Sequence, residues 1–265
     1  MRLQERDYLL GMTESECLQY GEILPFELQH GFRPGVQHLS KEPSVKKHLR
    51  SLFPNNFMNP SEVRNNSRID SINEKFLELL NDCSITERDI LNFINKGKYF
   101  HIPTAIIRGG QFRFGHHGAF LFPEFQLGIS YKADYLLVGK SSGGYEFIFV
   151  EFENCYKNIT CGDGELGETF RKGIQQVKDW KRWLDRNFFT LNEYWRKNTF
   201  QSLPDEFNSY DASRFHYVVV AGRRSDFKDK TYLIAREYRK TDDITLMHYD
   251  NLYDYACDVK NYSTF

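Results

Sequence analysis

The feature that most constrains this fold is a pair of apolar runs joined by a short link rich in glycine and serine. The runs are KADYLLVG at residues 132–139 and YEFIFVEFE at residues 145–153, and the link is SSGG at residues 141–144. Aromatic and branched side chains dominate both runs, which favours strands. Because such a link between two strands is typical of a tight turn, we predict an antiparallel hairpin.

Further short runs predict additional strands around this hairpin. They lie at residues 117–125, 215–221 and 244–249. Between the hairpin and the run at 215–221, residues 167–185 carry apolar side chains at spacings of three and four, which predicts an amphipathic helix packed on the sheet. This order favours an α/β sandwich, in which helices flank a mixed sheet, over an all-β barrel.

The N-terminal part of the chain differs in composition and in the spacing of its apolar residues. Residues 61–97 are mostly polar with apolar positions at helical spacing, and they predict two helices, one of which starts at a capping signal at Thr86. Residues 1–60 contain five prolines and little periodicity, so we expect an irregular region there. We therefore divide the chain into an accessory region, irregular then helical, at residues 1–98 and a domain that contains the predicted sheet at residues 99–265.

The composition indicates a packed globular protein. Of 265 residues, 40% are hydrophobic and 16% aromatic, and the formal net charge is −1. Basic residues are concentrated at residues 214–240, which could hold phosphates or form an ordinary solvated surface.

The five cysteines include no CxxC pair, and no apolar run approaches the roughly 18 residues of a membrane helix. We therefore expect a cytoplasmic protein with no membrane partner.

Two carboxylates end the second strand of the predicted hairpin. Since alternate side chains of a strand share a face, Glu151 and Glu153 emerge on the same side, and the residue between them is apolar. Asp134 begins the neighbouring strand, and the hairpin could bring it beside the glutamates. Three carboxylates at one sheet edge suit Mg²⁺ or Mn²⁺ and leave room for a phosphate. These residues therefore predict metal-dependent phosphodiester hydrolysis.

The predicted helix supplies a cation and an amide that could reach the same edge. Lys172 and Gln176 project from one face, and a lysine there would orient or deprotonate the attacking water and neutralise charge on the phosphate. In the structural alternative, Lys172 is a surface residue and the glutamates pair with Arg171 or Lys178. The order of Asp134, hairpin, paired glutamates and helix favours the catalytic interpretation.

Several segments together resemble the Shedu anti-phage defence nucleases, whose shared domain is catalogued as DUF4263. The resemblance covers the region from about His101 to about Tyr255. The segments are FGHHGAFLFPEFQLG (114–128), KADYLLVGKSSGGYEFIFVEFENC (132–155), KGIQQVKDWKRWL (172–184), VVVAGRR (218–224) and HYDNLYDYA (248–256). It implies a PD-(D/E)XK core of the restriction-endonuclease type, DNA as substrate, a divalent metal, a homo-oligomer such as a tetramer, and a role in defence against phage.

The same resemblance assigns roles to individual residues. Asp134 matches the motif aspartate and Glu151 the second acid, while Gln176 with Trp180 resembles a helix motif of the form QxxxY. The residues expected to contact DNA are Arg171, Trp180, Arg223 and Arg224.

Two positions depart from the family pattern. Ala133 replaces the motif proline, which is tolerable because proline there shapes only the backbone. Glu153 stands where the motif lysine is usual, so the catalytic cation must come from elsewhere, and Lys172 is the candidate. If no lysine reaches the site, the alternative function is a catalytically inactive module that binds DNA or protein.

Three further features have less specific assignments. Glu124 is a candidate additional acid or an ordinary structural pair. His116 is a candidate phosphate contact, and a joint metal site with His117 is disfavoured because adjacent strand side chains point apart. Residues 162–167 spell GxGxxG, but acids within the segment would repel a pyrophosphate, so we expect a flexible loop there and not a dinucleotide site.

Overall fold

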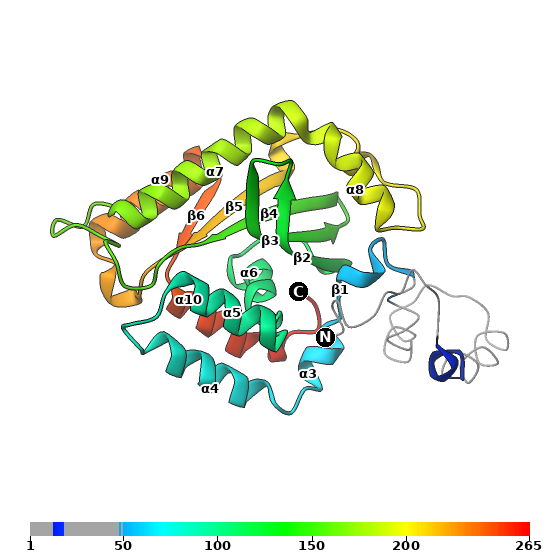
Figure 1. The fold of residues 1–265 in the computed structure, drawn as a ribbon, viewed down its shortest axis with the longest axis horizontal. Coiled ribbons are helices and arrows are strands. Elements are labelled where there is room, and N and C mark those ends of the chain that lie inside the picture. Colours follow the sequence, from blue (N-terminus) through cyan, green and yellow to red (C-terminus); the bar gives the residue numbers. More distant parts are fainter. Residues whose placement is uncertain (1–12, 19–47, 49) are drawn as a thin grey trace.

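One mixed sheet organises the structure. The computed structural model describes residues 13–18, 48 and 50–265, and six strands within them form a sheet in the order β1-β2-β3-β4-β5-β6 (Figure 1). The strands are β1 (Phe57–Met58), β2 (Gly118–Leu127), β3 (Tyr131–Ser141), β4 (Gly144–Phe152), β5 (Phe215–Val220) and β6 (Ile244–Met247). Pairing is antiparallel from β1 to β4 and parallel from β4 to β6. The five predicted strands and the mixed sheet are confirmed, and β1 is an addition.

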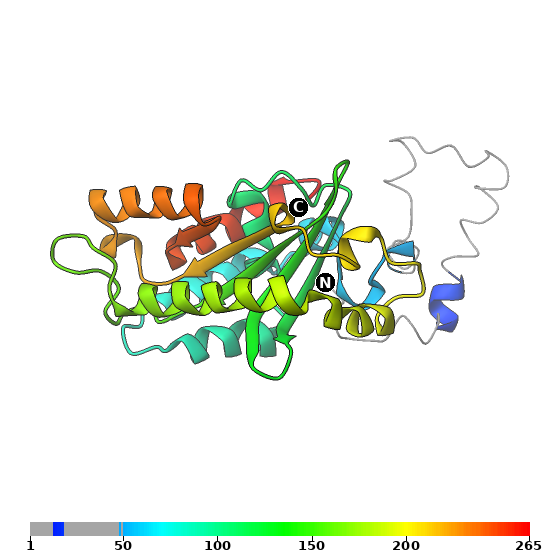
Figure 2. The ribbon, with the colours of Figure 1, turned by 90° about the horizontal axis from the view of Figure 1, so that it is seen from above.

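Helices cover both faces of this sheet. They are α3 (Pro60–Arg64), α4 (Ile69–Leu80), α5 (Glu87–Gly97), α6 (His101–Gly109), α7 (Glu168–Asn187), α8 (Asn192–Lys197), α9 (Asp229–Thr241) and α10 (Tyr249–Asp258). α7 and α9 lie over one face, and α4, α5, α6 and α10 lie over the other (Figures 1 and 2). The predicted α/β sandwich is therefore confirmed. In the described part of the chain, no helix has both the length and the apolar character that crossing a membrane requires.

Alternation along β3 and β4 separates two hydrophobic cores. Leu137 and Ile148 belong to the core that includes α6 and α10, whereas Leu136 and Phe149 belong to the core that includes α7. All four side chains are almost completely buried. A central strand covered on both faces must be apolar through its middle, which is why the two acidic residues of β4, Glu146 and Glu151, lie near its two ends.

The predicted hairpin is confirmed, and it has a two-residue turn. Ser141 pairs with Gly144, and the antiparallel register runs back to Tyr135 opposite Val150. Gly144 has a φ of 105°, a backbone conformation that favours glycine. The register places the first residues of β3 beside the last residues of β4.

The N-terminal helices pack on the same core as the C-terminal helix. α4 and α5 correspond to the two predicted helices, and they share a core with α10 through residues such as Phe76 and Ile90. α5 begins at the predicted cap, where Asp89 accepts hydrogen bonds from the Thr86 N–H and hydroxyl at 2.8 and 2.7 Å. The irregular region expected at residues 1–60 lies largely outside the described residues, and the boundary at residue 98 stays a prediction.

The predicted amphipathic helix is α7, with one correction to its faces. Trp180 follows Gln176 by four positions, a spacing that predicts the same exposed helix face as Lys172 and Gln176, but it is fully buried and its ring centroid lies 6.3 Å from that of Phe149. Trp180 follows Val177 by three positions and precedes Leu184 by four, so it belongs to the stripe that faces the sheet.

His216 connects three strands through two carboxylates. Its Nδ1 lies 2.8 Å from Asp243, just before β6, and its Nε2 lies 2.9 Å from Glu146 of β4. Burial alone would lower the pKa of His216, but the hydrogen bonds and charges of the two acids outweigh it and raise the pKa to about 9. The charged histidine therefore stabilises the register of β4, β5 and β6.

We predict that His216→Gln loses stability in a pH-dependent way. The folded pKa of about 9 lies above the ordinary value of 6.5, so the contribution is complete below pH 6.5 and is lost as the pH rises through 9. The free energy of unfolding should fall by about 2 kcal/mol at pH 6, and the difference from wild type should shrink by pH 10. Urea unfolding at both pH values measures this, with His117→Gln, an exposed histidine, as the control. An equal loss at both pH values would contradict the assignment.

Candidate active site

Three carboxylates gather where β4 ends. Glu151 is the penultimate residue of β4 and Glu153 follows the strand directly, and both are buried. Asp134 is half-buried near the start of β3, and the register continued by one pair places it opposite Glu151. Its carboxylate accepts a 2.7 Å hydrogen bond from the backbone N–H of Phe152. The structure thus brings together the three acids singled out in the sequence.

α7 supplies a polar partner to each glutamate. The Gln176 amide donates a 2.6 Å hydrogen bond to one oxygen of Glu151, and Lys172 Nζ lies 3.0 and 2.9 Å from the two oxygens of Glu153. The Glu153 side chain is almost completely buried, whereas that of Lys172 is 61% exposed. The other oxygen of Glu151 is buried and has no hydrogen-bond partner among the described residues.

Gly173 allows α7 to approach the strand ends this closely. A Cβ atom at this position would lie 2.7 Å from Cγ1 of Val219 and 3.1 Å from Cγ of Glu153, which is too tight for an ordinary side chain. Because the helix can settle onto the sheet at Gly173, the residues one before it and three after it, Lys172 and Gln176, reach the acids.

Burial raises the pKa of each of these acids. The pKa of Asp134 rises to about 7, because burial and the charges of neighbouring acids outweigh the hydrogen bond from Phe152. Burial, then the charges of Asp134 and Glu153, hold the pKa of Glu151 well above its usual range. Burial also raises the pKa of Glu153 despite its partner Lys172. The site therefore favours binding of protons or of a cation.

A fourth acid, Glu87, belongs to this site and was not identified from the sequence. It is the first residue of α5 and is half-buried, and its charge contributes to raising the pKa of Asp134, Glu151 and Glu153. Burial raises the pKa of Glu87 itself, which the charge of Lys172 opposes. The capping signal at Thr86 located the start of this helix, but no local pattern indicates that the helix start faces the end of β4.

The carboxylates of this site are suitable ligands for a hard divalent cation, although they are not already arranged as a coordination shell. No three His, Cys, Asp or Glu side chains within residues 13–18, 48 and 50–265 already converge as a metal site. The acids are instead engaged by Lys172, Gln176 and a backbone N–H. Carboxylate oxygens are nevertheless the donors that Mg²⁺ and Mn²⁺ prefer, and the unpartnered buried oxygen of Glu151 is available to one. The residues fit such a cation by their chemistry.

The sequence of this chain matches the model of one known protein family. The family model described as "Shedu protein SduA, C-terminal" matches residues 84–253, well over half of the chain. The chain belongs to this family. Membership supports a role in Shedu antiviral defence, and the matched region contains all four acids together with Lys172 and Gln176. No curated protein matches the chain in sequence.

Other residues singled out in the sequence lie outside the acid cluster of this Shedu domain. Glu124 is exposed and pairs with Lys132 at 2.6 Å. His116 is exposed just before β2, at the strand end that pairs with Lys140 and not at the end near the acids. Arg171 is exposed on α7 and could contact a phosphate, whereas the complete burial of Trp180 excludes it from direct contact with a DNA backbone in this structure.

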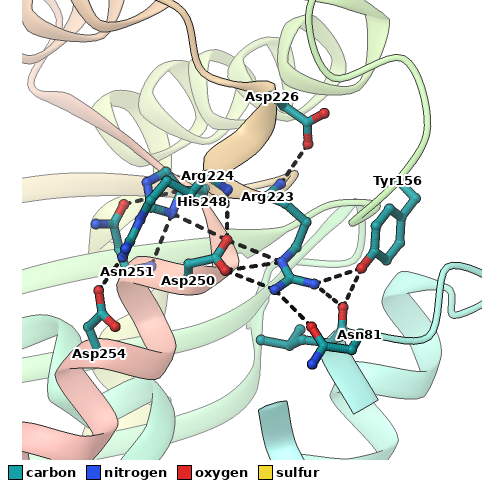
Figure 3. Close-up of polar contacts among 10 residues, drawn as sticks. Asn81, Tyr156, Arg223, Arg224, Asp226, His248, Asp250, Asn251 and Asp254 are labelled. Atoms are coloured by element: carbon teal, nitrogen blue, oxygen red, sulfur yellow. Dashed lines mark hydrogen bonds and ion pairs between the residues drawn. The ribbon is translucent and has the colours of Figure 1, made fainter. Parts of the chain in front are cut away.

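Arg223, expected to contact DNA, is instead an internal brace (Figure 3). Its guanidinium bonds Asp250 at the start of α10 at 2.8 Å, the Tyr156 hydroxyl at 2.6 Å, and the Leu80 carbonyl at the end of α4. Only 13% of the side chain is exposed. Arg224 is 57% exposed and pairs with Asp254, so it retains a surface position. The internal partners of Arg223 do not fit the DNA contact expected of it, whereas for Arg224 that contact stays a prediction.

The GxGxxG segment is anchored to α9 and not free as expected. Lys228 Nζ bonds the Gly162 carbonyl at 2.6 Å, and the Thr231 hydroxyl bonds the Gly164 carbonyl at 2.8 Å. Lys230 pairs with both acids of the segment, Asp163 and Glu165. Residues 162–165 therefore anchor the start of α9, which is a structural role.

We predict that Asp134→Asn is more stable than wild type in metal-free buffer at pH 8. Asp134 has a folded pKa of about 7 against an ordinary 3.8, so the folded protein holds more protons between these values and wild-type stability falls as the pH rises. The gain should be on the order of 2 kcal/mol at pH 8 and should vanish near pH 4. Chemical unfolding at both pH values measures it. A variant less stable than wild type at pH 8 would contradict the electrostatic account.

We also predict that Arg223 matters more for folding than Arg224. Arg223→Ala leaves the half-buried Asp250 without its ion-pair partner, which should lower the free energy of unfolding by about 2–4 kcal/mol. Arg224→Ala removes an exposed pair and should cost less than about 1 kcal/mol. Thermal or urea unfolding of both variants tests the contrast. Equal stability of the two variants would show that the internal contacts of Arg223 do not stabilise the fold.

Proposed function

We propose that this protein is a metal-dependent deoxyribonuclease of Shedu defence, with a PD-(D/E)XK core that cuts invading DNA. The observation that carries the proposal is the grouping of Asp134, Glu151 and Glu153 at the end of a central strand, under a helix whose Lys172 and Gln176 bond the two glutamates. Membership of the Shedu family supports the same activity. A homo-oligomeric assembly is part of the proposal and rests on the family resemblance.

The cation would be held by the carboxylates of Asp134, Glu151 and Glu153, with Glu87 as a further or outer partner. The cation would act as a Lewis acid on the scissile phosphate. Gln176 already binds one oxygen of Glu151 and would fix the orientation of that carboxylate, as outer partners of metal ligands do.

Lys172 would serve to neutralise charge and not to abstract a proton. The hydrogen bond and charge of Glu153 raise its pKa against the effect of burial, so the ammonium stays charged near neutral pH. A general base needs a pKa near the working pH, and the raised pKa of Lys172 does not meet that requirement. The 61% exposed ammonium could approach a phosphate of DNA lying along α7.

The proposal predicts cleavage of plasmid or linear duplex DNA in Mg²⁺ or Mn²⁺. Asp134→Ala and Glu151→Ala should each reduce the rate by about 100-fold or more, because loss of even an outer partner of a metal ligand costs about 10- to 100-fold. Glu87→Gln should reduce it by about tenfold. Glu124→Ala is the matched control, since Glu124 is an exposed acid outside the cluster, and it should leave the rate unchanged. Full activity in both alanine variants would refute the assignment.

A second candidate is an inactive binding module, and one observation favours it. Glu153 occupies the usual lysine position and forms an ion pair with Lys172, so the site contains a neutralised acid where a free cation is expected. Binding of DNA that persists in chelator, with no nicking in Mg²⁺ or Mn²⁺, would support this candidate. Nicking by the wild type would instead support the nuclease, and Lys172→Arg would then retain part of the rate if the site needs only a positive charge there.

A further inference from the structure

A cavity beside the acid site is the strongest unassigned feature of the described residues. It has a volume of about 400 Å³ and lies between the turn that joins β2 to β3 and the exposed side of α7. Tyr131 and Lys132 form one wall, and Lys172, Gln175 and Gln176 form the other. Lys172 and Gln176 also bond Glu153 and Glu151, so the cavity and the acid site share these two side chains.

The wall formed by the β2–β3 turn is fixed in place. Gly128 has a φ of 64°, and a Cβ there would lie 2.9 Å from the ring of Trp183, so the turn packs closely on α7. The turn lies beside α7 in both ribbon views (Figures 1 and 2). The next residue, Ile129, is fully exposed at the tip. A large apolar side chain is thus held out to solvent one residue before Ser130, which lines the cavity.

The chemistry of the walls matches one nucleotide. Each wall carries an exposed lysine that can meet a phosphate, with 44% of Lys132 and 61% of Lys172 accessible. The amides of Gln175 and Gln176 donate to Asp179 and Glu151, and their amide oxygens are the groups that could read a base edge. Asp179 also lines the cavity and is paired with Arg182. Tyr131 offers a half-buried ring on which a base can stack. The volume suits a small ligand and excludes a stacked base pair held in a duplex.

The geometry points to this cavity as a binding site for one unpaired DNA nucleotide, next to the phosphate that lies over the acids, with Ile129 placed against the adjoining base step. This inference rests on the proposed nuclease function and names its substrate class as DNA with at least one unpaired nucleotide. A base must leave the stack to enter the cavity, which costs the free energy of unpairing and unstacking it. In a bulge, a gap or a frayed end the base is already unpaired, so this free-energy cost is smaller. An exposed apolar residue beside the opening is the type of side chain that enters an unstacked step.

The test measures binding in chelator, so that cleavage plays no part. Fluorescence anisotropy compares a fully paired duplex with the same duplex carrying a one-nucleotide bulge. Wild type should bind the bulged probe about tenfold or more tightly, and Tyr131→Ala should remove most of that preference, as expected for loss of base stacking. Ile129→Ser changes an exposed residue that the fold does not need, so it tests the same point if Tyr131→Ala fails to fold.

Phe189→Ser, an exposed apolar residue beyond the C-terminal end of α7, is the matched control and should bind both probes as wild type does. Equal affinity for the two probes, absence of binding, or tighter binding of the corresponding RNA would overturn the inference. A preference for the bulge without cleavage in any metal would refute the nuclease and leave the cavity assignment standing. Cleavage without that preference would refute the cavity assignment alone.

Discussion

Burial of like charges at the end of β4 is the constraint on which the rest of the site depends. An ionised carboxylate in an apolar interior costs several kcal/mol unless it is paired or protonated. Here Glu153 has Lys172, whereas Glu151 has one amide hydrogen bond and Asp134 one backbone N–H. None of these contacts brings a full positive charge to Glu151. Replacing these acids by neutral side chains would give a more stable fold. Residues that destabilise the fold in this way are expected at sites retained for binding.

The topology of the sheet explains why α7 provides the partners. β4 and β5 are parallel neighbours, so the chain must cross over one face of the sheet between them. The crossover contains α7, and Gly173 lets that helix settle against Val219 of β5 and Glu153 after β4. Lys172 and Gln176 lie within one turn of this contact. A residue at either position is therefore directed to the acids by packing, whatever the chemistry of the site.

The sequence predicted features set by local periodicity and missed features set by packing. The hairpin, α7 and the shared face of Glu151 and Glu153 follow from alternation and turn residues, and the structure has all three. Glu87 lies far away in the sequence and reaches the site only because α5 packs beneath the sheet. Arg223 follows a strand among basic residues and looked exposed, yet the ends of α4 and α10 enclose it. Such approaches of distant segments leave no mark in local sequence.

The pairing of Glu153 with Lys172 couples the two ligands of the proposed reaction. Only Lys172 is accessible, so a DNA phosphate could compete for its ammonium while Glu153 stays buried. Glu153 would then lose the positive charge that compensates it, and its raised pKa means that it must gain a proton or a share of a cation. A divalent cation meets this need without a change of pH. An acid in the usual lysine position is thus compatible with the proposed catalysis. A phosphate that takes the Lys172 ammonium leaves the negative charge of Glu153 available to a divalent cation, which strengthens binding of that cation.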